Sequence, residues 1–183
     1  MEAIQAIHSR RTIRVYRSDP VGRALLKQVL WAAVQAPTPP VSCAASWKLC
    51  VIEGADRLAG FGARAKQYAF EHQPAGQRWD WTVRPEFKVF WNAPAVVVFY
   101  AQATNPEAPH DCCRAAQNML VAAHALGLGT CWVGAPIPWL TSTGVNEELG
   151  VPAGYVASVA VLVGYAAEQP VGEPRPEPEV LWC

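Results

Sequence analysis

Four arginines lie within eight residues near the start of the chain: Arg10, Arg11, Arg14 and Arg17. Guanidinium groups bind phosphate through paired, charge-assisted hydrogen bonds, so the cluster suits a phosphorylated ligand. A solvated basic segment explains an isolated charge run equally well. The formal net charge of the 183 residues is zero, which removes the main electrostatic reason to expect nucleic acid or an anionic membrane as a partner.

The usual motifs of protein-borne catalysis are missing from the sequence. It contains no G-x-S-x-G nucleophile elbow, no phosphate-binding P-loop and no H-E-x-x-H zinc helix. The six cysteines include no C-x-x-C pair, and no metal site is expected. No side chain is predicted to act as a catalytic acid, base or nucleophile. A chain with a large apolar fraction and no catalytic group of its own indicates that a cofactor carries the chemistry.

The chain carries no segment that predicts a membrane or secretory protein. No apolar run is long enough to cross a bilayer, and Glu2 and Gln5 interrupt the layout of a signal peptide. Without a secretory context the cysteines are expected to be reduced thiols. We therefore expect a cytoplasmic protein.

Hydrophobic periodicity predicts the helices that must position the arginines, over residues 2–9, 21–36, 55–70 and 111–126. The second helix is predicted to begin at Ser18, Asp19 and Pro20, because a capping side chain there precedes a proline. The fourth is apolar around most of its circumference, which predicts a buried helix. Gly127 or Gly129 should end it.

Strand-sized apolar runs predict a sheet, with strands at 47–52, 94–101 and 156–165 and a short strand or turn at 129–134. The aromatic-rich residues 73–91 are either a lid or an ordinary connection. The proline-rich residues 168–178 favour an extended conformation. The sequence therefore predicts one α+β domain over residues 1–183, with an extended C-terminal arm from about residue 166.

Six stretches, in order along the chain, resemble motifs of the nitroreductase family of FMN flavoproteins. They are Ser9-Arg10-Arg11-Thr12-Ile13-Arg14-Val15-Tyr16, Ala33-x-x-Ala36-Pro37-Thr38, Asn92-Ala93-Pro94, the run from Ala115 to Gly134, Leu149-Gly150-Val151-Pro152 with the later Val163-Gly164-Tyr165, and Pro174-Arg175-Pro176. The run from Ala115 to Gly134 is the most specific. One stretch alone would be weak, but six in register cover nearly the whole chain.

The resemblance implies an α+β fold, an α/β/α sandwich with a central, mainly antiparallel sheet. It also implies a homodimer with two FMN sites at the interface and a C-terminal arm that reaches across the partner. Eight tryptophans and a helix that is apolar nearly all round are consistent with a large buried surface.

The resemblance also implies the site residues. Arg10 and Arg14 would bind the phosphate or ribityl chain of FMN, with Arg11 and Thr12 in support. Arg175 would complete the phosphate site from the tail; alternatively, it is a solvated tail residue. Two segments would contact the isoalloxazine ring: Pro37, Thr38, Ser42, Cys43 and Ala45 in the first, and Cys131, Trp132, Val133 and Gly134 in the second.

This chain departs from the family at the first of those segments. The family usually has an asparagine and a glutamine before the tryptophan that here is Trp47, and Cys43 and Ala45 stand in their places. Two amide contacts to the flavin are then missing or supplied elsewhere. Cys43 is either a reactive thiol beside the flavin or a small apolar filler.

The chemistry implied by the resemblance is a ping-pong reaction at the flavin. NADH or NADPH would donate a hydride to flavin N5, and a nitroaromatic or quinone would then take two electrons at the same face. The aromatic residues of the 73–91 region would form a lid for flat acceptors or part of the dimer core: Trp79, Trp81, Phe87 and Trp91. Two alternatives stay open: a flavin-binding protein without turnover, and a relative that oxidises its substrate or uses the flavin with oxygen.

Overall fold

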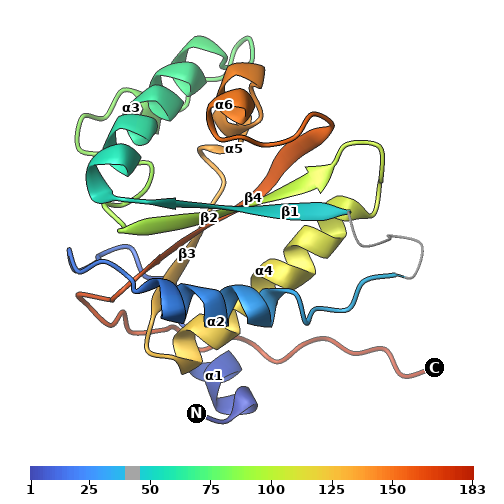
Figure 1. Ribbon diagram of the computed structural model, residues 1–183. Coiled ribbons are helices and arrows are strands. Elements are labelled where there is room, and N and C mark those ends of the chain that lie inside the picture. Colours follow the sequence, from blue (N-terminus) through green and yellow to red (C-terminus); the bar gives the residue numbers. More distant parts are fainter. Residues whose placement is uncertain (40–45) are drawn as a thin grey trace.

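The computed structural model describes residues 1–39 and 46–183. Within them, a four-stranded sheet with the order β1-β2-β4-β3 forms the centre, and every neighbouring pair is antiparallel. The strands are β1 (Trp47–Glu53), β2 (Ala95–Gln102), β3 (Gly129–Val133) and β4 (Tyr155–Gly164). Helices cover both faces of this sheet (Figure 1), so the predicted α/β/α sandwich is confirmed.

The two central strands are apolar on both faces, because each face of the sheet is covered by helices. Along β2, Val97 and Phe99 point into one core, whereas Val96, Val98 and Tyr100 point into the other. The alternation follows from the two-residue repeat of a strand. Strands buried on both sides read as continuous apolar runs, which is why this segment was recognisable in the sequence.

Two groups of helices complete the sandwich. One face carries α2 (Arg23–Ala33) and α4 (Ala108–Ala125), and α1 (Ala3–Ser9) packs on α4. The other face carries α3, the single turn η2, and the short helices α5 and α6 (Figure 1). Their bounds are Ala55–Glu71 for α3, Asp80–Thr82 for η2, Ile137–Leu140 for α5 and Thr143–Glu148 for α6. No helix of the described residues is both long and apolar enough to cross a membrane.

Gly127 ends α4, and it is one of the two glycines that the sequence predicted as the end of this helix. Its φ of 80° lies in the left-handed region, where glycine has no steric penalty. The N–H of Leu128 donates to the carbonyl of Ala123 at 2.8 Å, and the N–H of Gly127 donates to that of His124 at 3.0 Å. This pair of bonds is the Schellman motif, which satisfies two terminal carbonyls and turns the chain directly into β3.

The predicted start of the second helix was wrong. The helix α2 begins at Arg23, and Gly22 rather than Ser18 occupies the N-cap position. Asp19 is engaged elsewhere, because its carboxylate accepts a 2.8 Å hydrogen bond from Arg17. The Asp19 carboxylate therefore pairs with Arg17 and does not cap the helix, as the sequence pattern had predicted it would.

The arginine-bearing segment after α1 lies along the sheet. Thr12 forms a parallel bridge with Thr130, and Tyr16 forms an antiparallel bridge with Ala166. The segment can approach because Gly164 has no side chain: a Cβ built there would lie 2.6 Å from Pro94 Cδ and 2.7 Å from Tyr16 Cδ1. The first residues of the arm and the arginine segment are thereby held side by side.

The C-terminal arm is extended, as predicted. Beyond the Ala166 bridge the chain has no helix or strand, and it runs beneath α4 before leaving the body (Figure 1). Its end is apolar and uncovered: Leu181 is 93% exposed and Trp182 is 92% exposed.

Replacing Gly164 with alanine should destabilise the chain by about 1–3 kcal/mol, the usual range for overpacking a filled site. The added methyl group would press on the rings of Pro94 and Tyr16. Urea unfolding followed by fluorescence measures the change. Gly144→Ala is the matched control, since nothing lies within 4 Å of its Cβ position. Equal stability of the two variants would contradict this account.

Candidate functional site

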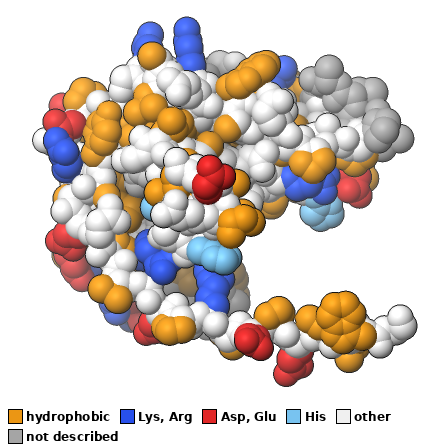
Figure 2. Space-filling view, turned by 90° about the horizontal axis from the view of Figure 1, so that it is seen from below, with side chains coloured by type: hydrophobic (Ala, Val, Ile, Leu, Met, Phe, Trp, Pro, Cys, Tyr) orange, Lys and Arg blue, Asp and Glu red, His pale blue; other side chains and the backbone are white. Residues whose placement is uncertain are grey.

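A hollow of about 790 Å³ lies between α1, α4 and the C-terminal arm. We call it the arginine pocket. Its walls come from three parts of the chain: Ile7, His8, Arg10, Arg11 and Thr12 at the N-terminal side, Gln117 from α4, and Gly172, Glu173, Pro174 and Arg175 from the arm. Figure 2 shows the molecule from below, with the arm standing away from the body and basic and histidine side chains gathered near its base. Four of the predicted phosphate-site residues therefore lie together.

The charges of this pocket repel one another. Burial lowers the pKa of Arg10, and the neighbouring guanidinium groups of Arg175 and Arg11 lower it further. None of the ion pairs formed by the described residues involves Arg10 or Arg175. Glu173 is the one acidic residue among the lining residues. A dianion placed between these arginines would relieve the repulsion and receive several charge-assisted hydrogen bonds.

Arg11 connects the two ends of the chain at this pocket. Its Nη1 donates to the carbonyls of His8 at 2.8 Å and Arg10 at 3.0 Å. The backbone of Gly172 in the arm lies so close that a Cβ there would overlap the Arg11 guanidinium. Arg11 therefore ties the turn after α1 to the arm that carries Arg175.

His124 supports the pocket from α4. Its Nε2 lies 2.8 Å from Ser9 Oγ, and that hydroxyl donates to the carbonyl of Gln5 at 2.7 Å, which leaves the imidazole N–H as the donor to Ser9. Burial lowers the pKa of His124, and Arg10 and Arg11 lower it further. The ring is thus a neutral, hydrogen-bonded link between α4 and the arginine turn.

Arg14 lies apart from the other predicted phosphate ligands. Its guanidinium carbon lies 5.8 Å from the ring centroid of Trp91, and its charge lies near enough to Cys131 to lower the pKa of that thiol. It is not among the residues that line the arginine pocket. Burial raises the pKa of Cys131, although Arg14 and Arg10 oppose this, so the thiol stays protonated near neutral pH.

The second predicted flavin segment lies on the edge strand β3 and the residue after it. The side chains of Cys131 and Val133 are buried in the core beneath α5, whereas Trp132 is 42% exposed and Gly134 is exposed. Thr12 forms its parallel bridge with Thr130 of this strand. The N–H of Ile13 donates to the carbonyl of Thr130 at 2.9 Å, which holds this strand next to the arginine segment.

Of the first predicted flavin segment, the structure describes Pro37 and Thr38. The ion pair of Arg23 with Glu53, at 3.1 Å, fixes the start of α2 at the end of β1. Pro37 and Thr38 follow the opposite end of that helix, and both are exposed. Ser42, Cys43 and Ala45 lie outside the described residues. One chain thus carries two separated groups of predicted site residues.

Sequence reasoning missed several pocket residues, among them Gln117, His8 and Glu173. Gln117 had a usable signal, because it is a polar and exposed position on a helix that is otherwise mostly apolar. Glu173 had none, since its neighbours in the arm follow no periodic pattern.

Replacing Arg10 with glutamine should weaken the binding of inorganic phosphate about tenfold to hundredfold, because hydrogen bonds to charged groups contribute about 1.5–3 kcal/mol. The ligand-free chain should be no less stable than wild type, since the replacement removes repulsion against Arg175 and Arg11. The phosphate-dependent shift in Tm measures both effects. Arg17→Gln, in the same segment but outside the pocket, is the control. A full phosphate response in the Arg10 variant would refute this role.

Known proteins share both this sequence pattern and this architecture. The profile of the Nitroreductase family matches residues 7–165. A relative from Methanothermobacter thermautotrophicus, whose name combines NADH dehydrogenase and NAD(P)H nitroreductase, is 26% identical over 174 residues, covering 93% of this chain and 80% of the relative.

Solved structures agree in fold. A nitroreductase from Bacteroides fragilis with bound FMN has a TM-score of 0.84 at 23% identity, over 97% of this chain and 95% of that chain. An oxidised iodotyrosine deiodinase bound to FMN and 3-iodo-L-tyrosine has a TM-score of 0.74 at 21% identity, over 99% and 98%. With the family profile spanning most of its length, this chain belongs to the nitroreductase family.

Proposed function

We propose that the chain is an FMN-dependent oxidoreductase that uses NADH or NADPH to reduce nitroaromatic or quinone-like acceptors. The observation that carries the proposal is the arginine pocket, where Arg10 and Arg11 from one end of the chain meet Arg175 from the other. The archaeal relative's name and the FMN in the Bacteroides fragilis structure support the same cofactor and donor.

The pocket fits the phosphate end of FMN in charge and size. A phosphate monoester carries nearly two negative charges, which three converging guanidinium groups can neutralise. The volume of about 790 Å³ lies within the ordinary range for ligand sites. In this proposal Arg10, Arg11 and Arg175 hold the phosphate, and Thr12 adds a hydroxyl.

The chain's own part in the reaction is positioning. Bound FMN would supply the two-electron chemistry: a quinone, NAD(P)H and one proton would become a hydroquinone and NAD(P)⁺. Residues 131–134 would present backbone groups beside the ring, and the exposed Gly134 leaves space for close approach. Donor and acceptor would use the same open face in turn, so no side-chain nucleophile is needed.

We further propose that the complete site requires two copies of the chain. Pro37 and Thr38 follow the end of α2 that is opposite the Arg23–Glu53 pair, and neither lines the arginine pocket of its own chain. Large apolar side chains are exposed on α1, α2 and the arm, and a second copy would cover them: Ile4, Ile7, Trp31, Val180, Leu181 and Trp182. The arm would reach across this partner.

Purified chain should bind FMN and turn yellow, and NADH or NADPH should bleach it under anaerobic conditions. Adding a nitroaromatic or a quinone should restore the colour with one acceptor consumed per NAD(P)H. Absorbance at the flavin band measures each step. Yellow protein that neither nucleotide bleaches would favour a flavin-binding protein without turnover, an alternative that the replacement of two amides by Cys43 and Ala45 supports. Colourless protein that does not bind added FMN would refute FMN as the cofactor.

Two defective variants should complement each other when mixed. A chain with Arg10→Gln and Arg175→Gln, and a chain with Thr38→Trp, should each be inactive alone. After subunit exchange about half of the dimers are mixed, and each has one intact site, so about a quarter of wild-type activity should return. Mixing two preparations of the arginine variant is the control. Mixed dimers without recovered activity would show that one chain supplies both groups.

A further inference from the structure

Four aromatic side chains form a continuous series through the connection between α3 and β2. The rings of Trp79 and Trp81 stack at 6.2 Å with an interplanar angle of 13°. Trp81 meets Phe87 at 5.3 Å, and Phe87 meets Trp91 edge-on at 5.5 Å. We call this series the aromatic ladder. All four residues are half-buried.

The last ring of the ladder meets the arginine segment. The Arg14 guanidinium lies 5.8 Å from the centroid of Trp91, within cation–π range. The segment that carries this arginine is bonded to β3, because the N–H of Ile13 donates to the carbonyl of Thr130 at 2.9 Å. Arg14 therefore joins the connection to a segment that is bonded to β3, the strand that leads to residues 131–134.

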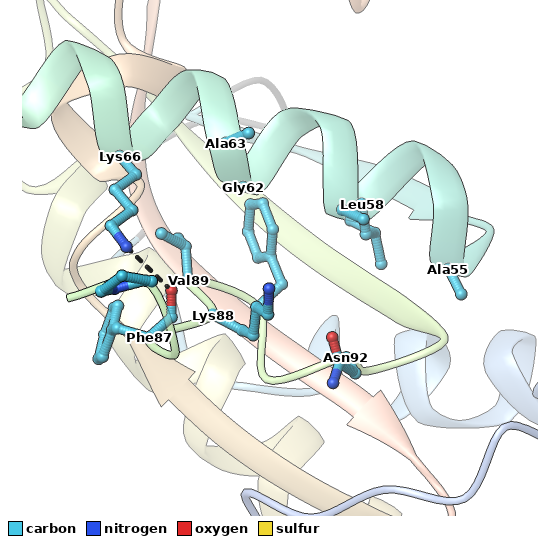
Figure 3. A pocket seen from close by; sticks show the side chains of 12 residues that line it. Ala55, Leu58, Gly62, Ala63, Lys66, Phe87, Lys88, Val89 and Asn92 are labelled. Atoms are coloured by element: carbon cyan, nitrogen blue, oxygen red, sulfur yellow. Dashed lines mark hydrogen bonds between the residues drawn. The ribbon is translucent and has the colours of Figure 1, made fainter. Parts of the chain in front are cut away.

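The backbone at the end of the ladder is unusual. Trp91 and Asn92 are consecutive non-glycine residues in the left-handed region, with φ of 50° and 53°. Such conformations are unfavourable for residues with a side chain and persist only where the surroundings enforce them. Asn92 also lines a separate hollow of about 270 Å³ between α3 and residues 85–92 (Figure 3). On the other side of this hollow, Lys66 hydrogen-bonds the carbonyls of Arg84 and Phe87 and fixes the middle of the connection on α3.

We propose that Arg14 is a positioning residue that latches the aromatic ladder onto β3, and that the ladder is the wall against which a planar aromatic acceptor lies. This inference rests on the proposed function. It assigns Arg14 to acceptor selection through Trp91, whereas Arg10, Arg11 and Arg175 serve the phosphate. Aromatic rings held at fixed tilt and partly open to solvent suit a flat acceptor.

The first test needs no flavin. Trypsin should cleave after Arg78, directly before the ladder, and after Lys88, inside it; both residues are exposed, whereas Pro85 protects the bond after Arg84. Arg14→Gln and Trp91→Leu should each speed this cleavage about two- to fivefold, the value of a partly exposed cation–π contact. Arg14→Lys, which keeps a cation, should stay near wild type, and the double variant should be no faster than either single one. Arg17→Gln is the matched control, because Arg17 lies over the ring of Tyr165, outside the ladder.

The second test separates acceptor binding from cofactor binding. Arg14→Gln and Trp91→Leu should raise KM for the nitroaromatic or quinone by the same factor and leave kcat unchanged. The Kd for FMN should stay within about twofold of wild type. A tenfold loss of FMN affinity in Arg14→Gln alone would overturn the proposal and make Arg14 a direct cofactor ligand.

The remaining outcomes are equally decisive. Additive effects of the two replacements on cleavage would show that Arg14 and Trp91 do not act together, and the latch would be refuted. A change of oligomeric state in Trp91→Leu would assign the ladder to the subunit interface and also refute it. If the wild-type chain binds no FMN, the proposed function fails, whereas the trypsin comparison still decides whether the latch exists.

Discussion

The arrangement of the site depends on like charges that the fold forces together. Arg10, Arg11 and Arg175 come from the two ends of the chain, and two backbone bridges, Thr12–Thr130 and Tyr16–Ala166, bring those ends side by side. Repulsion of this kind is unfavourable in the ligand-free chain, and after burial it is the next cause of the lowered pKa of Arg10. The sheet and its two cores must provide the free energy that keeps the arginines in place. A dianionic ligand then gains both the hydrogen bonds and the relief of repulsion.

If the chain positions a cofactor and the cofactor carries the chemistry, the sequence needs no catalytic side chain of its own, and it contains none that is recognisable. Electron transfer by a bound flavin needs orientation, a dry face and a charged anchor, and all three can come from backbone, apolar surface and arginine. The titratable groups near the pocket are accordingly in their neutral forms: the Cys131 thiol stays protonated, and His124 is a neutral hydrogen-bonding link.

Much of the fold could be predicted from the sequence, because periodicity reports burial. The apolar run of β2 and the all-round apolar α4 were recognisable for that reason, and Gly127 marked the end of α4. The start of α2 was not predictable, since Arg17 competes for the side chain of Asp19. The destination of Arg14 was hidden as well, because an irregular segment has no period that tells where a long side chain turns.

The site was predictable as a list of residues but not as a geometry. Arg10, Arg11, Thr12 and Arg175 lie together, whereas Pro37 and Thr38 do not line the same pocket, and the sequence carries no sign of that difference. Ser42, Cys43 and Ala45 fall outside the described residues, so the consequences of losing the two amides stay a prediction.

The uncovered end of the arm has a consequence for how the chain matures. Leu181 and Trp182 follow the proline-rich part of the arm, which has little freedom to fold back onto its own chain. They therefore stay exposed to water until a second surface covers them. Exposed apolar residues of this kind promote nonspecific association when chains are crowded during synthesis. Folding and assembly would then be one concentration-dependent process. Dilution would detach the arm before it unfolds the sheet.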